Sequence, residues 1–313
     1  GKIFNQYVAP LPLKIEESSA DESAFAHKPI FIFGTMRTGT TLIMDMLNEH
    51  SDTILTKGSP EREDVIMWVE LGASIMSGVG KRKSIGPVGH FYCLAMDETD
   101  ISSERVRFFN TELLKRYPGL RKGKRLVNGN THLGNKLRYV KRIFPDSCLV
   151  FLFRNPYAVS ASLKRKLLEF PNLMFEIPDS RSSCINIYPR YGWDSLPIAL
   201  WKKNPNIYNP EDPDSIRLFA RYWRNTVLFI LDQANCDNGV SFLTIRYEDI
   251  LCDHQHSLAN LLKYCSLSPF DDWKVLLKTD INKKRINMLS SREKAIIKEE
   301  LGDSVEHFGY EHL

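Results

Sequence analysis

Three continuous apolar runs stand out in the hydrophobic pattern of the chain. They read PIFIFG at residues 29–34, SCLVFLF at 147–153 and VSFLTIRY at 240–247. Each run has the length of one strand, and the first, PIFIFG, lacks the alternation of a half-exposed strand, so we expect that strand to be buried on both faces. Apolar residues recur at helical spacing elsewhere, over 40–50, 157–170, about 215–233 and about 256–265.

Strands that alternate with helices predict a parallel sheet with helices on both of its faces. The predicted fold class is therefore α/β, a three-layer α/β/α arrangement like that of proteins with phosphate-binding loops. In such sheets ligands bind at the carboxyl ends of the strands. The segments that follow residues 34 and 153 are thus the first places to search for a functional site.

The rest of the pattern sets the domain organisation. Residues 1–27 are polar, with two prolines and an acidic run, and indicate an arm in front of the folded part. We interpret residues 28–313 as a single domain with two irregular insertions. The insertion at 74–92 is rich in glycine, and the one at 178–213 is rich in proline and aromatic residues. We expect both to be long loops or short helices over the open end of the sheet, where a substrate would enter.

Composition excludes several classes of protein. Of the 313 residues, 43% are hydrophobic and 26% are charged, which is typical of a folded globular chain. The formal net charge of +4 is too small to predict a nucleic-acid partner. No apolar run approaches the roughly 18 residues of a membrane-spanning helix. The six cysteines show no paired spacing, which favours reduced thiols over a zinc site or a disulfide framework.

The same features bear on location. The sequence has no N-x-[ST] acceptor for glycosylation and no leading signal segment. Together with reduced cysteines, these observations predict a cytoplasmic protein. A lumenal enzyme trimmed of its membrane anchor would show the same pattern, so that alternative stays open.

The first apolar run leads into a phosphate-binding loop that lacks its lysine. The usual triphosphate loop reads G-x-x-x-x-G-K-[ST]; Gly34 and Gly39 keep this spacing, but Thr40 stands at the lysine position. What remains is a helix N-terminus with one guanidinium and three hydroxyls, from Arg37, Thr38, Thr40 and Thr41. These groups predict a cradle for a small anion that carries few charges.

The second apolar run ends in a cation. A triphosphate-binding site completes its magnesium coordination with a carboxylate at the end of a neighbouring strand. Here Arg154 occupies that place. A guanidinium favours a further phosphate and opposes a divalent metal ion. The two motifs together predict a metal-free site for a nucleotide with two separate anionic groups.

These motifs resemble those of the sulfotransferases. FGTMRTGTTLIMDMLNEH (33–50) is similar to the family's 5′-phosphosulfate loop, in which a strand leads into [KR]-[ST]-G-T-[TS]-L. FLFRNPYAVSASL (151–163) is similar to the 3′-phosphate motif R-[ND]-P-x(5)-S, with Arg154 and Ser162 at the contacting positions. RYEDIL (246–251) and the closing stretch 292–310 also resemble the family, the latter its bacterial and protein-tyrosine branch. The resemblance covers about residues 28–310.

The resemblance implies sulfuryl transfer from 3′-phosphoadenosine 5′-phosphosulfate (PAPS), with the bisphosphate PAP as product and no metal ion. It assigns the phosphosulfate to Arg37, Thr38, Gly39, Thr40 and Thr41, with Arg37 stabilising the departing phosphate. It assigns the 3′-phosphate to Arg154 and Ser162. A basic stretch containing Lys284 and Arg285 stands where many members contact the 3′-phosphate, although a solvated charge run has the same pattern. Positioning and hydrogen-bond donors would take the role that Mg²⁺ has in phosphoryl transfer.

Such a transfer needs a base for the proton of the acceptor, and histidine suits this role best. His132 stands 22 residues before Arg154, and its THL resembles the KTHL of cytosolic members, whose histidine is the base. His132 is our first candidate, against the alternative of a capping or solvent-exposed loop histidine. The family lysine two residues earlier is Asn130 here, so a cation is missing, and Lys136 and Arg138 are its nearest substitutes.

A glutamate is the rival base. The tyrosine-sulfating and bacterial branch uses a glutamate shortly after the first helix, and Glu61 and Glu63 stand a few residues from that place. Acidic residues at helix starts are common for dipole reasons alone. Glu61 is therefore the second candidate.

Three functions stay open on the sequence alone. The first is a PAPS-dependent sulfotransferase acting on a small-molecule, carbohydrate or carrier-bound acceptor, which the sequence does not identify. The second is a nucleotide kinase with a variant phosphate loop, which predicts a Mg²⁺ requirement. The third is a protein that binds the nucleotide without turnover, and Asn130 is the residue that favours it.

Overall fold

The computed structural model describes most of the predicted domain. The described residues are 25–56, 68, 95–169, 175–180, 183–189, 207–209, 212–235, 239–270, 273, 279–304 and 308–310. The insertion at 74–92 and most of the arm at 1–27 lie outside them. Ala26 of the arm is described, and it is buried, with its N–H donating to Asn110 Oδ1 at 3.3 Å.

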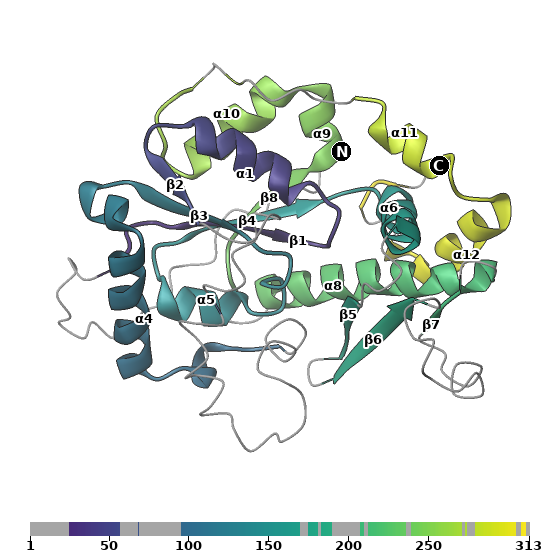
Figure 1. Cartoon of the computed structure of the whole chain (residues 1–313), viewed down its shortest axis with the longest axis horizontal. Coiled ribbons are helices and arrows are strands. Elements are labelled where there is room, and N and C mark those ends of the chain that lie inside the picture. Colours follow the sequence, from purple (N-terminus) through teal and green to yellow (C-terminus); the bar gives the residue numbers. More distant parts are fainter. Residues whose placement is uncertain are drawn as a thin grey trace.

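A five-stranded sheet forms the centre of the molecule (Figure 1). Its strands in spatial order are β2 (Thr53–Leu55), β3 (Arg125–Gly129), β1 (Ile30–Gly34), β4 (Cys148–Phe153) and β8 (Leu243–Arg246). All four neighbouring pairs are parallel. The predicted parallel sheet is confirmed, and the three apolar runs form its adjacent strands β1, β4 and β8.

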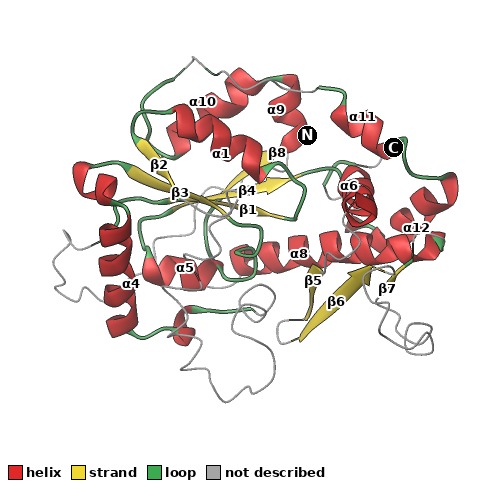
Figure 2. Cartoon of the chain, viewed as in Figure 1, coloured by secondary structure: helices red, strands yellow, loops and turns green. Residues whose placement is uncertain are grey.

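Helices cover both faces of the sheet, as Figures 1 and 2 show. One face carries α1 (Thr40–Glu49), α9 (Tyr247–Cys252) and α10 (His254–Tyr264). The core on the other face contains residues of α4 (Ser103–Arg116), α5 (Leu137–Ile143), α6 (Pro156–Glu169), α8 (Arg217–Asn235) and α12 (Ser291–Leu301). The remaining short helices are α11 (Ile281–Ile286), η3 (Glu98–Asp100), η4 (Pro118–Lys122) and η6 (Pro213–Ile216). Within the described ranges, no helix has the length and apolarity needed to cross a membrane.

Alternate residues of the central strands pack into two separate hydrophobic layers. Ile30 and Ile32 of β1 lie in the layer with α1 and α10, whereas Phe31 and Phe33 lie in the layer with α5 and α8. All four side chains are fully buried. Burial on both faces explains why the sequence shows continuous apolar runs instead of alternation. The three-layer α/β/α prediction is confirmed.

The second predicted insertion, 178–213, contains strands where we expected loops or short helices. β5 (Phe175–Ser180) and β6 (Ser183–Pro189) form an antiparallel hairpin, and β7 (Ile207–Tyr208) pairs with β6 in parallel. Figure 2 shows these strands apart from the central sheet. Prolines argue against a strand, and this misled the prediction. Pro178 lies where the register of the hairpin shifts, which is a place where a sheet tolerates proline.

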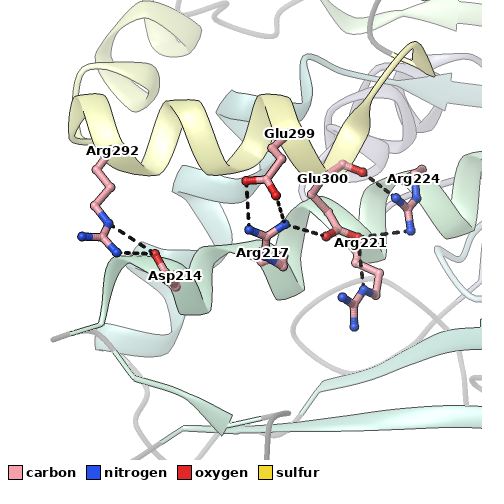
Figure 3. Close-up of polar contacts among 7 residues, drawn as sticks. All are labelled: Asp214, Arg217, Arg221, Arg224, Arg292, Glu299 and Glu300. Atoms are coloured by element: carbon pink, nitrogen blue, oxygen red, sulfur yellow. Dashed lines mark hydrogen bonds and ion pairs between the residues drawn. The ribbon is translucent and has the colours of Figure 1, made fainter.

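A cluster of arginines fastens α12 to α8 (Figure 3). Glu300 of α12 is 8% exposed, and three arginines of α8 contact its carboxylate at 3.1–3.2 Å: Arg217, Arg221 and Arg224. Their spacing of three and four residues places them on one face of the helix. Because a buried carboxylate is unfavourable unless it is paired, this cluster fixes the position of α12 on α8.

Candidate active site

The loop between β1 and α1 is shaped by two glycines. A β-carbon at Gly34 would lie 2.0 Å from the carbonyl oxygen of Leu152 on β4, so no larger residue fits. Gly39 has φ of +100°, and a β-carbon there would lie 2.5 Å from the ring of Tyr247. Arg37 is also left-handed, with φ of 68°. The spacing of the two glycines is therefore required by contacts with neighbouring elements as well as by the turn.

The polar groups of this loop are only partly used within the protein. α1 begins at Thr40, and Gly39 before it has no side chain to cap the first N–H groups. The hydroxyl of Thr38 is buried and donates to the Thr35 carbonyl at 2.7 Å, which holds the loop in place. Thr40 is buried and Thr41 is exposed. An uncapped helix N-terminus of this kind suits an anion.

Arg154 and Ser162 lie directly against the loop. Arg154 Nη1 donates to the Arg37 carbonyl at 2.9 Å, and Arg37 Nε donates to Ser162 Oγ at 3.1 Å. Arg154 is 6% exposed, and its Nη2 has no acceptor within the part of the chain that the structure describes. Its guanidinium lies 4.4 Å from the ring centroid of Tyr247. The two predicted anion-binding motifs thus meet in one continuous site.

Three guanidinium groups gather at this site. Burial lowers the pKa of Arg154, and the charges of Arg37 and Arg285 lower it further, whereas Tyr247 and Glu248 raise it. The pKa of Arg285 is also lowered, by burial first and then by neighbouring arginines that include Arg37. Arginine keeps its charge at neutral pH, so these groups repel one another, and an anion among them would relieve that repulsion.

Glu248 supports this cluster from α9. Its carboxylate accepts hydrogen bonds from the backbone N–H of Asn155 at 3.0 Å, from the Tyr310 hydroxyl at 2.9 Å and from the side-chain amide of Asn282. Asn282 in turn accepts a hydrogen bond from Arg154 Nε at 2.7 Å. Glu248 therefore joins the β4–α6 turn, α11 and the C-terminal segment, and it orients Arg154 through Asn282. Sequence reasoning missed this role because every contact is long-range.

His132 lies in the turn between β3 and α5, at the same edge of the sheet. The N–H of Asn130 donates to the Ile32 carbonyl on β1 at 2.9 Å, and Asn130 Oδ1 accepts from the His132 N–H at 2.8 Å. Asn130 is fully buried, and its Nδ2 has no partner among the described residues. The fully buried Lys136 donates to the His132 carbonyl at 3.1 Å and to Asn135 Oδ1 at 2.6 Å. Lys136 therefore orders the turn that carries the half-buried His132.

Helix α8 anchors all three loops. Each loop is bound by one polar side chain of α8: Tyr222 OH accepts from the Met36 N–H (2.6 Å), Trp223 Nε1 donates to the Arg154 carbonyl (2.9 Å), and Gln233 Nε2 donates to the Gly134 carbonyl (2.6 Å). Tyr222 and Trp223 are buried. One rigid helix thus fixes the phosphate loop, Arg154 and the His132 turn relative to one another.

Two predicted cations pair with carboxylates. Lys284 is exposed, and its ammonium pairs with Asp280 at 2.6 Å, whereas Arg285 of the same stretch lies near Arg37. Arg138, a possible substitute for the missing lysine, pairs with Glu98. Of the basic stretch on α11, Arg285 is thus the residue that interacts with Arg37, and the assignment of Lys284 stays a prediction.

The rival base Glu61 and its neighbour Glu63 lie outside the residues that the structure describes. His132 is the candidate base whose surroundings can be stated. Among the described residues, no three His, Cys, Asp or Glu side chains are arranged to hold a metal ion.

Several known proteins are similar to this chain. The nodulation protein NoeE of Sinorhizobium fredii (strain NBRC 101917 / NGR234) is 27% identical over 158 residues, and the match covers 50% of this chain and 35% of NoeE. The sulfotransferase domain of the Synechococcus PCC 7002 olefin synthase superposes with a TM-score of 0.48 at 14% identity, over 94% of this chain and 99% of that domain. Sulfotransferase STF1 of Mycobacterium tuberculosis H37Rv gives 0.46 at 13% identity, over 90% of this chain and 78% of STF1.

The match to a sequence model of a protein family assigns this chain to a family. The model of the sulfotransferase family matches residues 29–191, just over half of the chain. This range contains the phosphate loop, the His132 turn and the motif with Arg154 and Ser162, which the fold brings to one edge of the sheet. The chain belongs to the sulfotransferase family.

Proposed function

We propose that this chain transfers a sulfuryl group from PAPS to a hydroxyl or amine of an acceptor, without a metal ion. The observation that carries the proposal is the contact between the two anion-binding motifs, in which Arg37 bonds both Arg154 and Ser162. A ligand that fits both motifs needs two separate anionic groups on one small molecule, and PAPS carries them on its 5′ and 3′ positions. A triphosphate instead carries all of its charges in one linear group. In this loop it would also find no lysine to contact its phosphates.

The residues fit this donor on physical grounds. The uncapped N-terminus of α1, with the hydroxyls of the loop, would hold the phosphosulfate. Arg154 Nη2 is a buried donor without an acceptor among the described residues, and the 3′-phosphate would supply one. Ser162 and Arg285 would complete that end of the site. Three crowded guanidinium groups favour a dianion because it relieves their mutual repulsion.

His132 is the base in this proposal. The acceptor oxygen attacks sulfur, the bond between sulfur and the bridging oxygen of the 5′-phosphate breaks, and the acceptor's proton goes to the His132 ring. The charge that develops on the bridging oxygen is stabilised by the N-terminus of α1 and by Arg37. Asn130 and Lys136 hold the His132 turn through hydrogen bonds, so the base needs little reorganisation.

Asn130 favours a second candidate function, which is binding of the nucleotide without turnover. It stands where the family carries a lysine, and the fold leaves its amide Nδ2 without a partner among the described residues. A neutral amide donates a hydrogen bond but supplies no charge to the transferring group.

Two measurements separate these functions. Calorimetric titration with PAP in a metal chelator should show binding, and ATP with Mg²⁺ should bind far more weakly. Incubation with radiosulfate-labelled PAPS and pools of small-molecule, carbohydrate and carrier-bound hydroxyl compounds should then label an acceptor. Binding of PAP without label transfer to any pool would favour the second candidate. Tight binding of ATP that depends on Mg²⁺ would instead support the kinase alternative.

The cellular location belongs to the same proposal. Cys148, Cys252 and Cys265 are free thiols in the structure. Free thiols of this kind are typical of a reducing compartment, which supports a cytoplasmic enzyme.

A further inference from the structure

Two cysteines and one arginine meet at the end of the sheet opposite to the active site. Cys148 is the first residue of β4, Arg125 is the first residue of β3, and Cys265 follows α10. Arg125 Nη2 donates to Cys148 Sγ at 3.3 Å, and its Nη1 donates to the Cys265 carbonyl. Cys148 Sγ also contacts the carbonyl of Tyr264, the residue before Cys265, at 4.0 Å, and the two thiols are near enough for each to shift the pKa of the other. We call these three residues the thiol pair site.

The arginine of this site lacks an ordinary counterion. Arg125 is 6% exposed, and no carboxylate of the described residues forms an ion pair with it. Its other contact is a hydrogen bond from Nε to the Lys28 carbonyl at 2.7 Å. A buried cation is unfavourable unless a negative charge or several acceptors compensate for lost water. Arg125 has three acceptors here, and a thiolate at Cys148 would add the negative charge.

The surroundings make the two sulfurs chemically different. The Cys265 thiol lowers the pKa of the Cys148 thiol, and the cations Arg125 and Lys141 lower it further against the effect of burial. The Cys148 thiol and burial raise the pKa of Cys265. Asp146 also acts on Lys141, whereas Tyr264 has its pKa raised by burial and stays neutral. Cys148 is also partly exposed, whereas Cys265 is fully buried.

We propose that Cys148 and Cys265 form a peroxide-reactive thiol pair, in which Cys148 is oxidised first and Cys265 then closes a disulfide. The Cys148 thiolate attacks one oxygen of hydrogen peroxide, the O–O bond breaks, and the hydroxide that leaves is protonated to water. Cys148 becomes a sulfenic acid. The Cys265 sulfur attacks the Cys148 sulfur, the S–O bond breaks, and the Cys265 proton leaves with that hydroxide as a second water.

Atoms and electrons balance over the two reaction steps. Two thiols are oxidised to one disulfide, and one peroxide molecule is reduced to two waters. The site lies at the amino ends of the strands, so the proposal stands independently of the donor and of the base assigned to the transfer reaction.

The test uses the full chain with the other four cysteines, Cys93, Cys184, Cys236 and Cys252, replaced by serine. After a short exposure to hydrogen peroxide, peptide mass spectrometry should find Cys148 joined to Cys265, with a loss of two hydrogens that dithiothreitol reverses. In the Cys265→Ser variant, Cys148 should accumulate as a sulfenic acid that dimedone labels. In the Cys148→Ser variant, Cys265 should stay reduced because its thiol is buried and protonated.

A second measurement checks the role of the arginine. The rate at which iodoacetamide alkylates Cys148 should increase with pH. The midpoint of this pH–rate curve should lie well below the pKa of an ordinary cysteine, which is roughly 8.5. Arg125→Gln should move that midpoint upward. If this variant does not fold, the milder Lys141→Gln can be measured instead, and it should move the midpoint in the same direction. An ordinary midpoint at Cys148, or sulfenic acid at Cys148 without a disulfide to Cys265 in the background variant, would overturn the proposal.

Discussion

Replacement of Arg154 by alanine tests whether the two anion-binding motifs hold opposite ends of one nucleotide. Arg154 makes two hydrogen bonds within the protein, to the Arg37 carbonyl and to Asn282 Oδ1, and keeps Nη2 without an acceptor among the described residues. A hydrogen bond from a charged donor to a 3′-phosphate contributes about 1.5–3 kcal/mol. Arg154→Ala should therefore raise the dissociation constant of PAP about 10- to 150-fold.

The stability of the unliganded protein should also fall. Alanine loses the two internal hydrogen bonds, which come from a charged donor and contribute about 1.5–3 kcal/mol each. It also removes a buried charge that repels Arg37 and Arg285, and this opposes the loss. Urea unfolding without ligand should thus report a loss below about 6 kcal/mol, so two ligands that differ in the 3′-phosphate are needed to isolate the ligand contact.

The assay is calorimetric titration with two ligands, PAP and 5′-AMP, which lacks the 3′-phosphate. Arg154→Ala should weaken binding of PAP and leave binding of 5′-AMP nearly unchanged. The matched control is Arg246→Ala, because Arg246 pairs with Phe153 in the neighbouring strand and its guanidinium is engaged by Asp249 at 2.8 Å. Unchanged PAP affinity in Arg154→Ala, or an equal loss for both ligands, would refute the assignment of the 3′-phosphate to Arg154.

Four further substitutions follow from the structure. His132→Ala should lower turnover by about 10²–10⁴ while the PAP affinity persists, and near-normal turnover would remove His132 as the base. Gly39→Ala should destabilise the fold by roughly 1–2 kcal/mol or more in urea unfolding, because φ there is +100°; unchanged stability would contradict this loop geometry. Glu248→Gln should cost about 1.5–3 kcal/mol of unfolding free energy, since one carboxylate serves three donors, and a smaller change would deny it that role. Glu300→Gln should cost roughly 1–3 kcal/mol, less than a fully buried pair because its arginines are about one-third exposed, whereas the exposed Glu299→Gln should cost under about 1 kcal/mol.

The parts of the fold that could be predicted are those with a local signal. β1 and β4 are buried on both faces and are therefore continuously apolar in sequence. β3 was missed because two of its five residues are polar and buried: Arg125 bonds backbone carbonyls, and Asn128 is satisfied by Trp68 and Thr56. Such strands look like loops, since partners far along the chain make the polar residues tolerable.

The candidate site also contains parts with a local sequence signal and parts without one. The phosphate loop and the motif of Arg154 and Ser162 could be found because each is one short segment with fixed spacing. The supports supplied by α8 and Glu248 could not, because their hydrogen bonds join residues that only the tertiary fold brings together. The local pattern of α8 shows its apolar face and gives no sign of which loops Tyr222 and Trp223 hold.

The missing lysines of this site have different consequences at its two ends. At the nucleotide end, Arg37, Arg154 and Arg285 come from three separate segments and together supply the charge that a loop lysine would bring. Near His132, Asn130 does not replace the charge of the family lysine. Asn130 offers a neutral Nδ2, and the ammonium of Lys136 is turned to the His132 carbonyl and to Asn135. Under the proposed function, charge therefore accumulates where the donor would be held and is reduced where sulfur would be transferred. Because charge at the transferring group acts on the transition state, this arrangement should lower the rate of transfer more than it weakens binding of the donor.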